Sequence, residues 1–131
     1  MFLLDTNVCI RLLNRSSSRV AQRLRGLQPS QVRLCSVVKA ELCCGAHKSS
    51  RPSENLRLLD SFFEPFVSEP FDDRCVEPYA AIRRELERAG RPIGANDLLI
   101  ASIALVHGLT LVTHNVEEFS RVVGLRYEDW E

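Results

Sequence analysis

Short apolar runs alternate with longer segments of helical periodicity along this chain, and this alternation restricts the fold more than any other feature. The first run, residues 1–4, stops at Asp5, as a strand buried on both faces of a sheet would. Further short strands are expected at residues 32–35, 67–71 and 109–113. Because strands that alternate with helices form parallel sheets, we expect an α/β protein, a three-layer α/β/α sandwich with a short, mainly parallel central sheet.

The segments between these runs carry apolar residues at helical spacing. Helices are expected directly after Asp5, over about 20–27, from Ser36 to about Ala46, over 52–66, from Asp72 or Asp73 to Gly90, and over 96–107. Ser36 is well placed to cap its helix, and Gly90 and Gly108 to end theirs. The segment 96–107 is apolar on nearly all sides, which is typical of an interior helix. With no internal repeat or linker, a single domain is expected over residues 1–131.

Composition excludes several classes of protein. The chain is 45% hydrophobic and 26% charged, so it has enough apolar side chains to avoid disorder. We find no apolar run near the roughly 20 residues of a membrane span, and no secretory signal, so we expect a cytoplasmic protein with reduced cysteines. A metal site at Cys43, Cys44 and His47 is the alternative use of the thiols, but a second pair of ligands is missing.

Charge is unevenly distributed, although the formal net charge is zero. Residues 1–51 hold nine basic and two acidic side chains, whereas residues 52–131 hold eight basic and fifteen acidic ones. A chain divided in this way could present a basic face to a polyanion such as nucleic acid. Alternatively, the two parts interleave in the fold and their fields cancel, and the sequence leaves both arrangements open.

Polar side chains with catalytic potential fall where the predicted strands end. Asp5 ends the first strand, and Asn115 stands two residues beyond the last one. Asp97 lies in the first turn of the interior helix, and Glu41 lies on or beside the inward face of its own helix. Since the carboxyl ends of parallel strands form the edge where α/β proteins bind ligands, we expect these residues at one edge.

Each of these residues also has a purely structural explanation. Asp5 and Asp97 could serve helix N-termini, Glu41 could pair with an arginine, and Asn115 with Glu118 has the form of a capping box. Taken together, however, carboxylates at one edge repel one another, by about 4 kcal/mol for a pair ~4 Å apart at an effective dielectric of about 20. A divalent cation removes that repulsion, and oxygen ligands favour Mg²⁺ or Mn²⁺, which suits phosphoryl chemistry.

The sequence around these residues resembles the PIN-domain ribonucleases of the VapC type, the toxins of bacterial type II toxin–antitoxin pairs. The matching segments are Leu4–Val8, Ser36–Leu42, Gly94–Ala101, Leu111–Asn115, Glu118–Phe119 and Gly124–Trp130. They extend over nearly the whole chain in the expected order and spacing. The ordered set is highly specific, although none of the segments is decisive alone.

The resemblance implies an α/β/α fold and a Mg²⁺- or Mn²⁺-dependent endoribonuclease with Asp5, Glu41 and Asp97 around the metal. The fourth position, acidic in many PIN domains, is Asn115, which implies three carboxylates, with Asn115 and Thr113 hydrogen-bonding a ligand, a water or the substrate. That departure leaves a second metal open. Family members typically cut structured RNA, often tRNA, are inhibited by a small VapB-type antitoxin, and are often homodimers.

A mechanism and a set of substrate contacts follow from the resemblance. We expect Asp5 and Asp97 to hold the cation directly, and Glu41 to complete its shell or orient the attacking water. Residues at the entrance are expected to steady a phosphate, namely Thr6, Asn7 and Ser36. Basic residues of the first part are candidates for RNA backbone contacts or, alternatively, form a solvated face: Arg11, Arg15, Lys39 and Lys48.

Other functions remain as alternatives at the level of sequence. A metal-free ribonuclease would use paired histidines, and His47, His107 and His114 form no evident pair, although His114 follows the last predicted strand. A non-catalytic nucleic-acid-binding or scaffold module would keep the fold without the reaction. A metal-dependent DNA nuclease would use the same acids. A phosphorylated receiver domain would need an aspartate after the third strand, where the chain reads Glu69-Pro70-Phe71.

Overall fold

The central sheet consists of short parallel strands. The computed structural model describes residues 1–14 and 18–131. Within these residues there are five strands: β1 (Phe2–Leu4), β2 (Val32–Cys35), β3 (Val67–Glu69), β4 (Thr110–Val112) and β5 (Tyr127–Glu128). Their order across the sheet is β3-β2-β1-β4-β5, and each neighbouring pair is parallel. The expected α/β fold with a parallel sheet is confirmed, and the two-residue β5 is an addition to the predicted strands.

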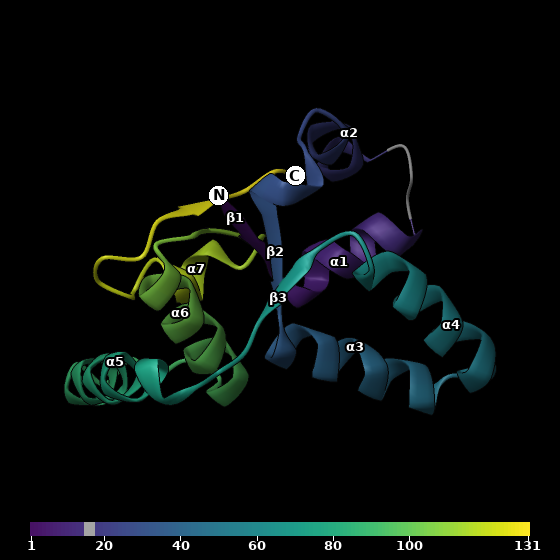
Figure 1. Ribbon diagram of the computed structural model, residues 1–131. Coiled ribbons are helices and arrows are strands. Elements are labelled where there is room, and N and C mark those ends of the chain that lie inside the picture. The colour runs from purple at the N-terminus through teal and green to yellow at the C-terminus, as the bar shows by residue number, and fades with distance from the viewer. Residues whose placement is uncertain (15–17) are drawn as a thin grey trace.

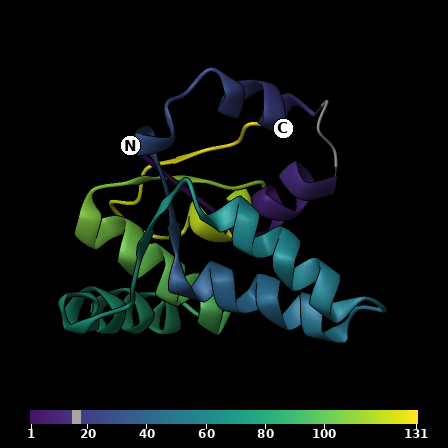
Figure 2. The same cartoon turned by 45° about the vertical axis from the view of Figure 1, so that its right-hand side comes forward.

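Helices connect these strands and cover both faces of the sheet. Between β1 and β3 lie α1 (Thr6–Asn14), α2 (Arg19–Arg25), α3 (Ser36–Lys48) and α4 (Pro52–Phe63); after β3 come α5 (Val76–Arg88), α6 (Ala95–His107) and α7 (Val116–Phe119). Figure 1 shows α1, α3 and α4 on one side and α5, α6 and α7 on the other, as right-handed crossovers in opposite directions require. The turned view in Figure 2 shows α2 at the far end of the molecule from α3.

The core is formed where the strands meet the helix layers. Leu4 in β1, Leu111 in β4 and Ile100 in α6 have no exposed surface, because helices cover the sheet on both faces. The expected interior helix is therefore confirmed in α6. It ends at Gly108 with a φ of 62°, and Gly90 follows α5 with a φ of 68°, a left-handed conformation that glycine adopts without steric cost.

Helix boundaries differ from the sequence prediction at α3, α4 and α5, and α5 begins at Val76 because the expected start at Asp72 or Asp73 is a separate 3-10 turn. Ser36 is the first residue of α3, and the capping position before it is taken by Cys35 in an extended conformation, so the predicted capping role of Ser36 is wrong. The fourth helix ends at Phe63 instead of Phe66, because the chain turns there, with a backbone hydrogen bond from Phe66 to Phe63, to enter β3 at Val67.

Ion pairs join the basic first part of the chain to the acidic second part. The pairs that cross between the two parts include Arg11–Glu131 at 2.6 Å, Arg23–Glu128 at 3.2 Å and Arg33–Glu69 at 2.8 Å. The two parts therefore interleave at these points, and three cations of the first part face carboxylates. In the described part of the chain, helices that are both long and apolar enough to cross a membrane are absent.

Candidate active site

The chain leaves β1 and β4, which are neighbours in the middle of the sheet, toward opposite helix layers. From β1 it enters α1 on one face, and from β4 it enters α7 on the other (Figure 1). Such a divergence opens a crevice at the carboxyl ends of the two strands, where α/β proteins bind ligands. Asp5 follows β1 and Thr113 follows β4, so both residues stand at this crevice.

Asp5 is almost fully buried, and hydrogen bonds fix both of its carboxylate oxygens. The Thr113 hydroxyl donates to Oδ2 over 2.8 Å, and the backbone N–H of Thr6 donates to Oδ1 over 2.8 Å. Burial raises the pKa of Asp5, the two hydrogen bonds oppose that rise, and neighbouring carboxylates add to it. The Thr113 hydroxyl in turn accepts a bond of 3.0 Å from the backbone N–H of Asn115. The side chain of Asp5 is thus oriented by the protein itself.

Glu41 reaches the same crevice from α3. This helix begins directly after β2, the neighbour of β1, so its first turns lie at the same edge of the sheet. The Thr6 hydroxyl donates to Glu41 Oε1 over 2.6 Å. Thr6 therefore links two carboxylates, because its backbone binds Asp5 and its side chain binds Glu41.

Asp97 and Glu118 form a second acidic pair, between the first turn of α6 and α7. Burial raises the pKa of Asp97 to about 8, together with its hydrogen bond to Glu118 and the charges of Asp5, Glu118 and Glu41. The pKa of Glu118 is lowered, chiefly by the hydrogen bond with Asp97. The Asn115 amide also donates to Glu118 Oε2 over 3.1 Å. Without a cation, Asp97 thus keeps a proton near neutral pH.

We refer to these four carboxylates as the acid cluster: Asp5, Glu41, Asp97 and Glu118. The pKa of Asp97 is raised chiefly by burial and further by the neighbouring carboxylates, and a bound divalent cation would offset both effects. A set of carboxylate oxygens fits Mg²⁺ or Mn²⁺. The four acids influence one another without forming a compact set of ligand atoms. In the described residues, the one group of three with ligand atoms all within 4.8 Å of one another is His114, Asp129 and Glu131.

Two hollows flank the acid cluster. One, of about 570 Å³, is lined by Asn7 and Asn115 among others, and the second, of about 640 Å³, lies between α3 and α6 and is lined by Ser36 and Glu41. Asn7, Ser36 and Asn115 are therefore accessible to a ligand. Thr6 and Thr113, which the sequence suggested as substrate contacts, donate their hydroxyl hydrogens to carboxylates.

Glu118 is the member of the acid cluster that the sequence did not indicate as a site residue. From the sequence, Asn115 is the fourth polar position, and Glu118 stands as the end of a capping box and within a segment that matches the family. In the structure the Asn115 side chain bonds Glu118, which brings that carboxylate to Asp97. The spacing of three residues, which sets both side chains on one side of a helical turn, is the signal that could have found it.

The remaining candidates from the sequence have varied surroundings. Arg11 pairs with Glu131, the Lys39 ammonium lies 4.9 Å from the centre of the Phe63 ring, and Lys48 lines the groove between α3 and α6. Arg15 lies outside the described residues. All five cysteines are free within the described chain, and the close group of ligand atoms found there does not include the alternative site at Cys43, Cys44 and His47.

Comparison with known proteins gives consistent similarities. Residues 2–125 match the family described as PIN domain. The tRNA(fMet)-specific endonuclease VapC of Shigella flexneri is 40% identical over 129 residues, which are 98% of this chain and 97% of that protein. A chain in the crystal structure of VapBC2 from Rickettsia felis bound to a promoter DNA fragment has a TM-score of 0.93 at 37% identity, covering 99% of this chain and 98% of its own. A chain of DNA-bound VapBC from Salmonella typhimurium has a TM-score of 0.93 at 36% identity, with coverage of 99% and 98%.

Proposed function

This chain belongs to the PIN-domain family and to its VapC type, and on that premise we propose that it is a Mg²⁺-dependent endoribonuclease toxin. It would hydrolyse phosphodiester bonds in structured RNA, with tRNA as the favoured substrate. The acid cluster at the crevice between β1 and β4 is the observation that carries this proposal, because it combines the oxygen ligands of a divalent cation with a position where α/β proteins bind ligands. A relative named as a tRNA(fMet)-specific endonuclease supports the choice of RNA.

The proposed cofactor is Mg²⁺, with Mn²⁺ as a substitute. Asp5, Asp97 and Glu41 would hold it, with Glu118 beside Asp97. When bound, the cation supplies a lowered pKa for a water molecule and neutralises charge on phosphoryl oxygens. Because the pKa of Asp97 is raised to about 8 when no cation is bound, we expect cation uptake to release protons.

The protein's own side chains would orient the acids and guide the attacking water. Thr113 and Thr6 fix the carboxylate of Asp5, so this group does not have to be ordered when substrate arrives. Glu41, held by the Thr6 hydroxyl, would complete the ligand set or orient the attacking water. Asn115 would act through Glu118, which it holds beside Asp97. Hydrolysis by water should leave a 5′-phosphate and a free 3′-hydroxyl.

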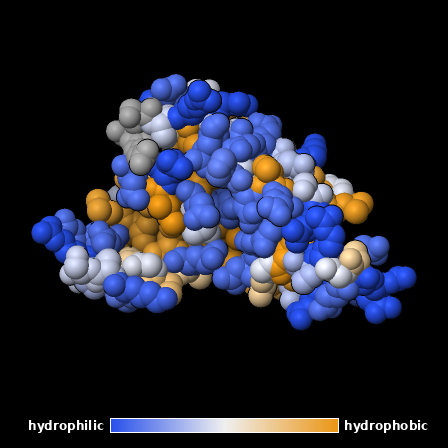
Figure 3. Space-filling model, turned by 180° about the vertical axis from the view of Figure 1, so that it is seen from behind, coloured by the Kyte–Doolittle hydropathy of each residue, from blue (hydrophilic) through white to orange (hydrophobic). Residues whose placement is uncertain are grey.

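We propose a VapB-type antitoxin and a second copy of this chain as protein partners, acting in the cytoplasm. The solved structures similar to this chain include VapBC complexes. An apolar surface for such contacts lies along α1, where Ile10 and Leu13 are 41% and 40% exposed, and the view from behind in Figure 3 shows hydrophobic side chains gathered there. Light scattering of the protein alone and with the product of a neighbouring short gene would test both partners.

The proposed function is tested by mapping RNA ends. The purified protein is incubated with total tRNA in Mg²⁺, in Mn²⁺ and in EDTA, with the Asp97→Asn variant as control. We expect cleavage with either cation only, and product ends with 5′-phosphate. Cleavage that persists in EDTA with cyclic phosphate ends would instead support a metal-free ribonuclease. Cleavage of DNA but not RNA would identify a DNA nuclease, and no cleavage of either would favour the binding-module alternative.

A further inference from the structure

The hollow of about 570 Å³ beside the acid cluster has a lining suited to a nucleotide. It lies between α1 and the segment that follows β4, and its polar lining is formed by Asn7, Arg11, Asn14, His114, Asn115 and Glu131. Two of its sides therefore come from the segments that carry Asp5 and Thr113 at the crevice, and Glu131 comes from the segment after β5.

The hollow lies next to the crevice that holds Asp5. Asn7 follows Asp5 by two residues, and Asn115 follows Thr113 by two residues, while Asp5 and Thr113 are joined by a hydrogen bond of 2.8 Å. An RNA strand whose scissile phosphate lies at the acid cluster would therefore have a neighbouring nucleotide in this hollow.

The chemistry of the lining matches the parts of a nucleotide. Asn7, Arg11 and Asn14 follow one another at spacings of four and three on α1, so they share one face of that helix. The amide of asparagine both donates and accepts hydrogen bonds, as recognition of base and ribose edges requires. The guanidinium of Arg11 presents a planar fork of donors that fits a phosphate.

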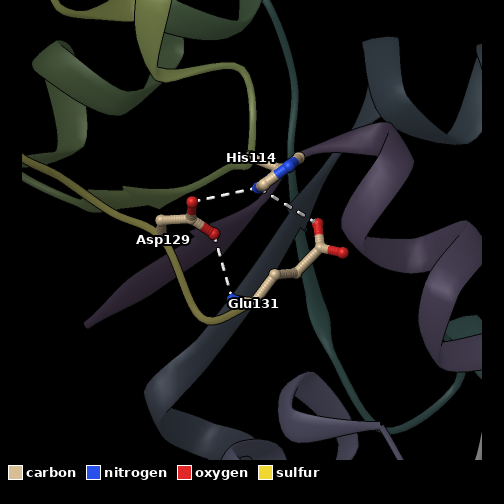
Figure 4. Close-up of side chains that lie close together, drawn as sticks. All are labelled: His114, Asp129 and Glu131. Atoms are coloured by element: carbon tan, nitrogen blue, oxygen red, sulfur yellow. Dashed lines mark hydrogen bonds and ion pairs between the residues drawn. The ribbon is translucent and has the colours of Figure 1, made fainter.

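Asp129 and Glu131 form ion pairs with the two basic side chains of this hollow, Arg11 and His114. Glu131 Oε1 lies 2.6 Å from the Arg11 guanidinium, and His114 Nδ1 lies 3.0 Å from Asp129 Oδ2 and 3.7 Å from Glu131 Oε2. Figure 4 shows both acidic side chains pointing at the histidine ring, and the backbone N–H of Glu131 donates to Asp129 Oδ1 over 3.0 Å. The carboxylate oxygens thus stand where the oxygens of a phosphate would bind.

A bound cation is the other interpretation of this group of three side chains. The guanidinium of Arg11 argues against it, because a permanent positive charge already lies in contact with Glu131. A second positive ion at the same carboxylate would be repelled by that charge. An anion, by contrast, would be attracted by Arg11 once Glu131 moves aside.

We propose that this hollow is the subsite for the nucleotide next to the scissile phosphate, in which Arg11 and His114 bind one RNA phosphate. Asp129 and Glu131 hold these two groups in the absence of RNA, and the substrate must displace them. Displacing the carboxylates therefore lowers the affinity for every RNA that uses this hollow. This inference rests on the proposed ribonuclease function and adds to it the position of one substrate phosphate and a competing internal ligand.

Binding of a short fluorescein-labelled RNA hairpin, followed by fluorescence anisotropy in Mg²⁺, tests the subsite. All variants carry Asp97→Asn so that the RNA stays intact. Arg11→Gln should weaken binding about tenfold and reduce the slope of log affinity against log salt by about 1. Glu131→Gln should tighten binding about threefold to tenfold, because it frees Arg11 and removes a negative charge. Arg84→Gln, which removes one arginine from α5 on the opposite helix layer, is the matched control and should leave binding unchanged.

A variant that carries both Arg11→Gln and Glu131→Gln tests whether these two residues act on RNA binding through each other. If Glu131 acts by occupying Arg11, then Glu131→Gln should change affinity much less in a chain that already carries Arg11→Gln. Tighter binding by Glu131→Gln cannot come from misfolding, so it separates the proposal from a structural effect. The subsite is wrong if the parent binds RNA and both Arg11→Gln and Glu131→Gln bind it with the same affinity as the parent. It is also wrong if Arg84→Gln weakens RNA binding as much as Arg11→Gln does. In either case the ribonuclease proposal stands. If the parent binds no RNA, the subsite proposal fails, whereas the ribonuclease proposal is decided separately by whether the unaltered protein cleaves tRNA in Mg²⁺.

Discussion

The hydroxyl of Thr113 donates a hydrogen bond of 2.8 Å to the carboxylate of Asp5, which lies 108 positions earlier in the chain. Both side chains are buried, and the bond ties the carboxyl end of β4 to that of β1. The hydrogen bonds from Thr113 and Thr6 fix the orientation of the Asp5 carboxylate without a ligand. This part of the acid cluster is therefore organised before a cation or a substrate binds.

Replacing this hydroxyl should destabilise the protein. Thr113→Val keeps the shape of the side chain but leaves Asp5 Oδ2 and the backbone N–H of Asn115 without their partner. We expect the free energy of unfolding to fall by about 1–3 kcal/mol, measured by urea denaturation. Thr110→Val, in the strand β4 that Thr113 follows, is the control. Equal effects of the two substitutions would show that the bond to Asp5 is not what matters.

Removing the carboxylate of Asp97 should abolish RNA cleavage while the fold persists. Asp97→Asn deletes a proposed cation ligand, so we expect the rate of tRNA cleavage to fall at least about a hundredfold. The melting temperature should stay the same or rise, because a crowded carboxyl has been removed. Glu85→Gln on the exposed side of α5 is the control and should be fully active. Undiminished cleavage by Asp97→Asn at saturating Mg²⁺ would refute the proposed metal site.

Glu118 should control the protonation of Asp97. Glu118→Gln removes a negative charge and supplies an amide donor, and both changes favour the ionised form of Asp97. We expect the pKa of Asp97 in the metal-free protein to fall by at least about one unit, followed by carbon-13 NMR of labelled aspartate carboxyls. The neighbouring Glu117→Gln should leave it unchanged, since that side chain is 86% exposed. An unchanged Asp97 titration in Glu118→Gln would remove Glu118 from the acid cluster.

Stability of the metal-free protein should fall as pH rises from about 5 to 9. A carboxyl whose pKa is raised in the folded state stabilises the fold below its ordinary pKa of 3.8, and this contribution is lost as pH rises through about 8 for Asp97. Asp5 acts with the same sign, whereas the lowered pKa of Glu118 affects only more acidic solutions. We expect a loss on the order of 2 kcal/mol, allowing for solvent around the half-buried Asp97.

Urea denaturation in EDTA across this pH range measures the effect. Asp97→Asn serves as the control, and its stability should depend on pH less steeply, because the side chain that titrates has been removed. A wild-type protein that is equally stable at pH 5 and pH 9 in EDTA would show that the carboxylates of the crevice do not crowd one another.

The local pattern of the sequence determined the strands and helices that position the site. The apolar run before Asp5 and the nearly all-apolar helix after Asn96 follow from side-chain periodicity, which is a property of neighbouring residues. Family resemblance singled out Asp5, Glu41 and Asp97 as the candidate acids, together with the position of Asp5 at a strand end and of the other two on inward-facing helices. The capping role of Ser36 failed because the choice between adjacent residues at a helix start depends on how the chain leaves the preceding strand.

Only the tertiary structure decided which of these side chains act on one another. The pairing of β1 with β4 brings Thr113 to Asp5, and the packing of α6 beside α7 brings Glu118 to Asp97. Ion pairs such as Arg11–Glu131 likewise unite the basic and acidic parts of the chain. Strand order and helix packing result from burying many apolar surfaces at once, and contacts between residues a hundred positions apart leave no periodic trace in the sequence.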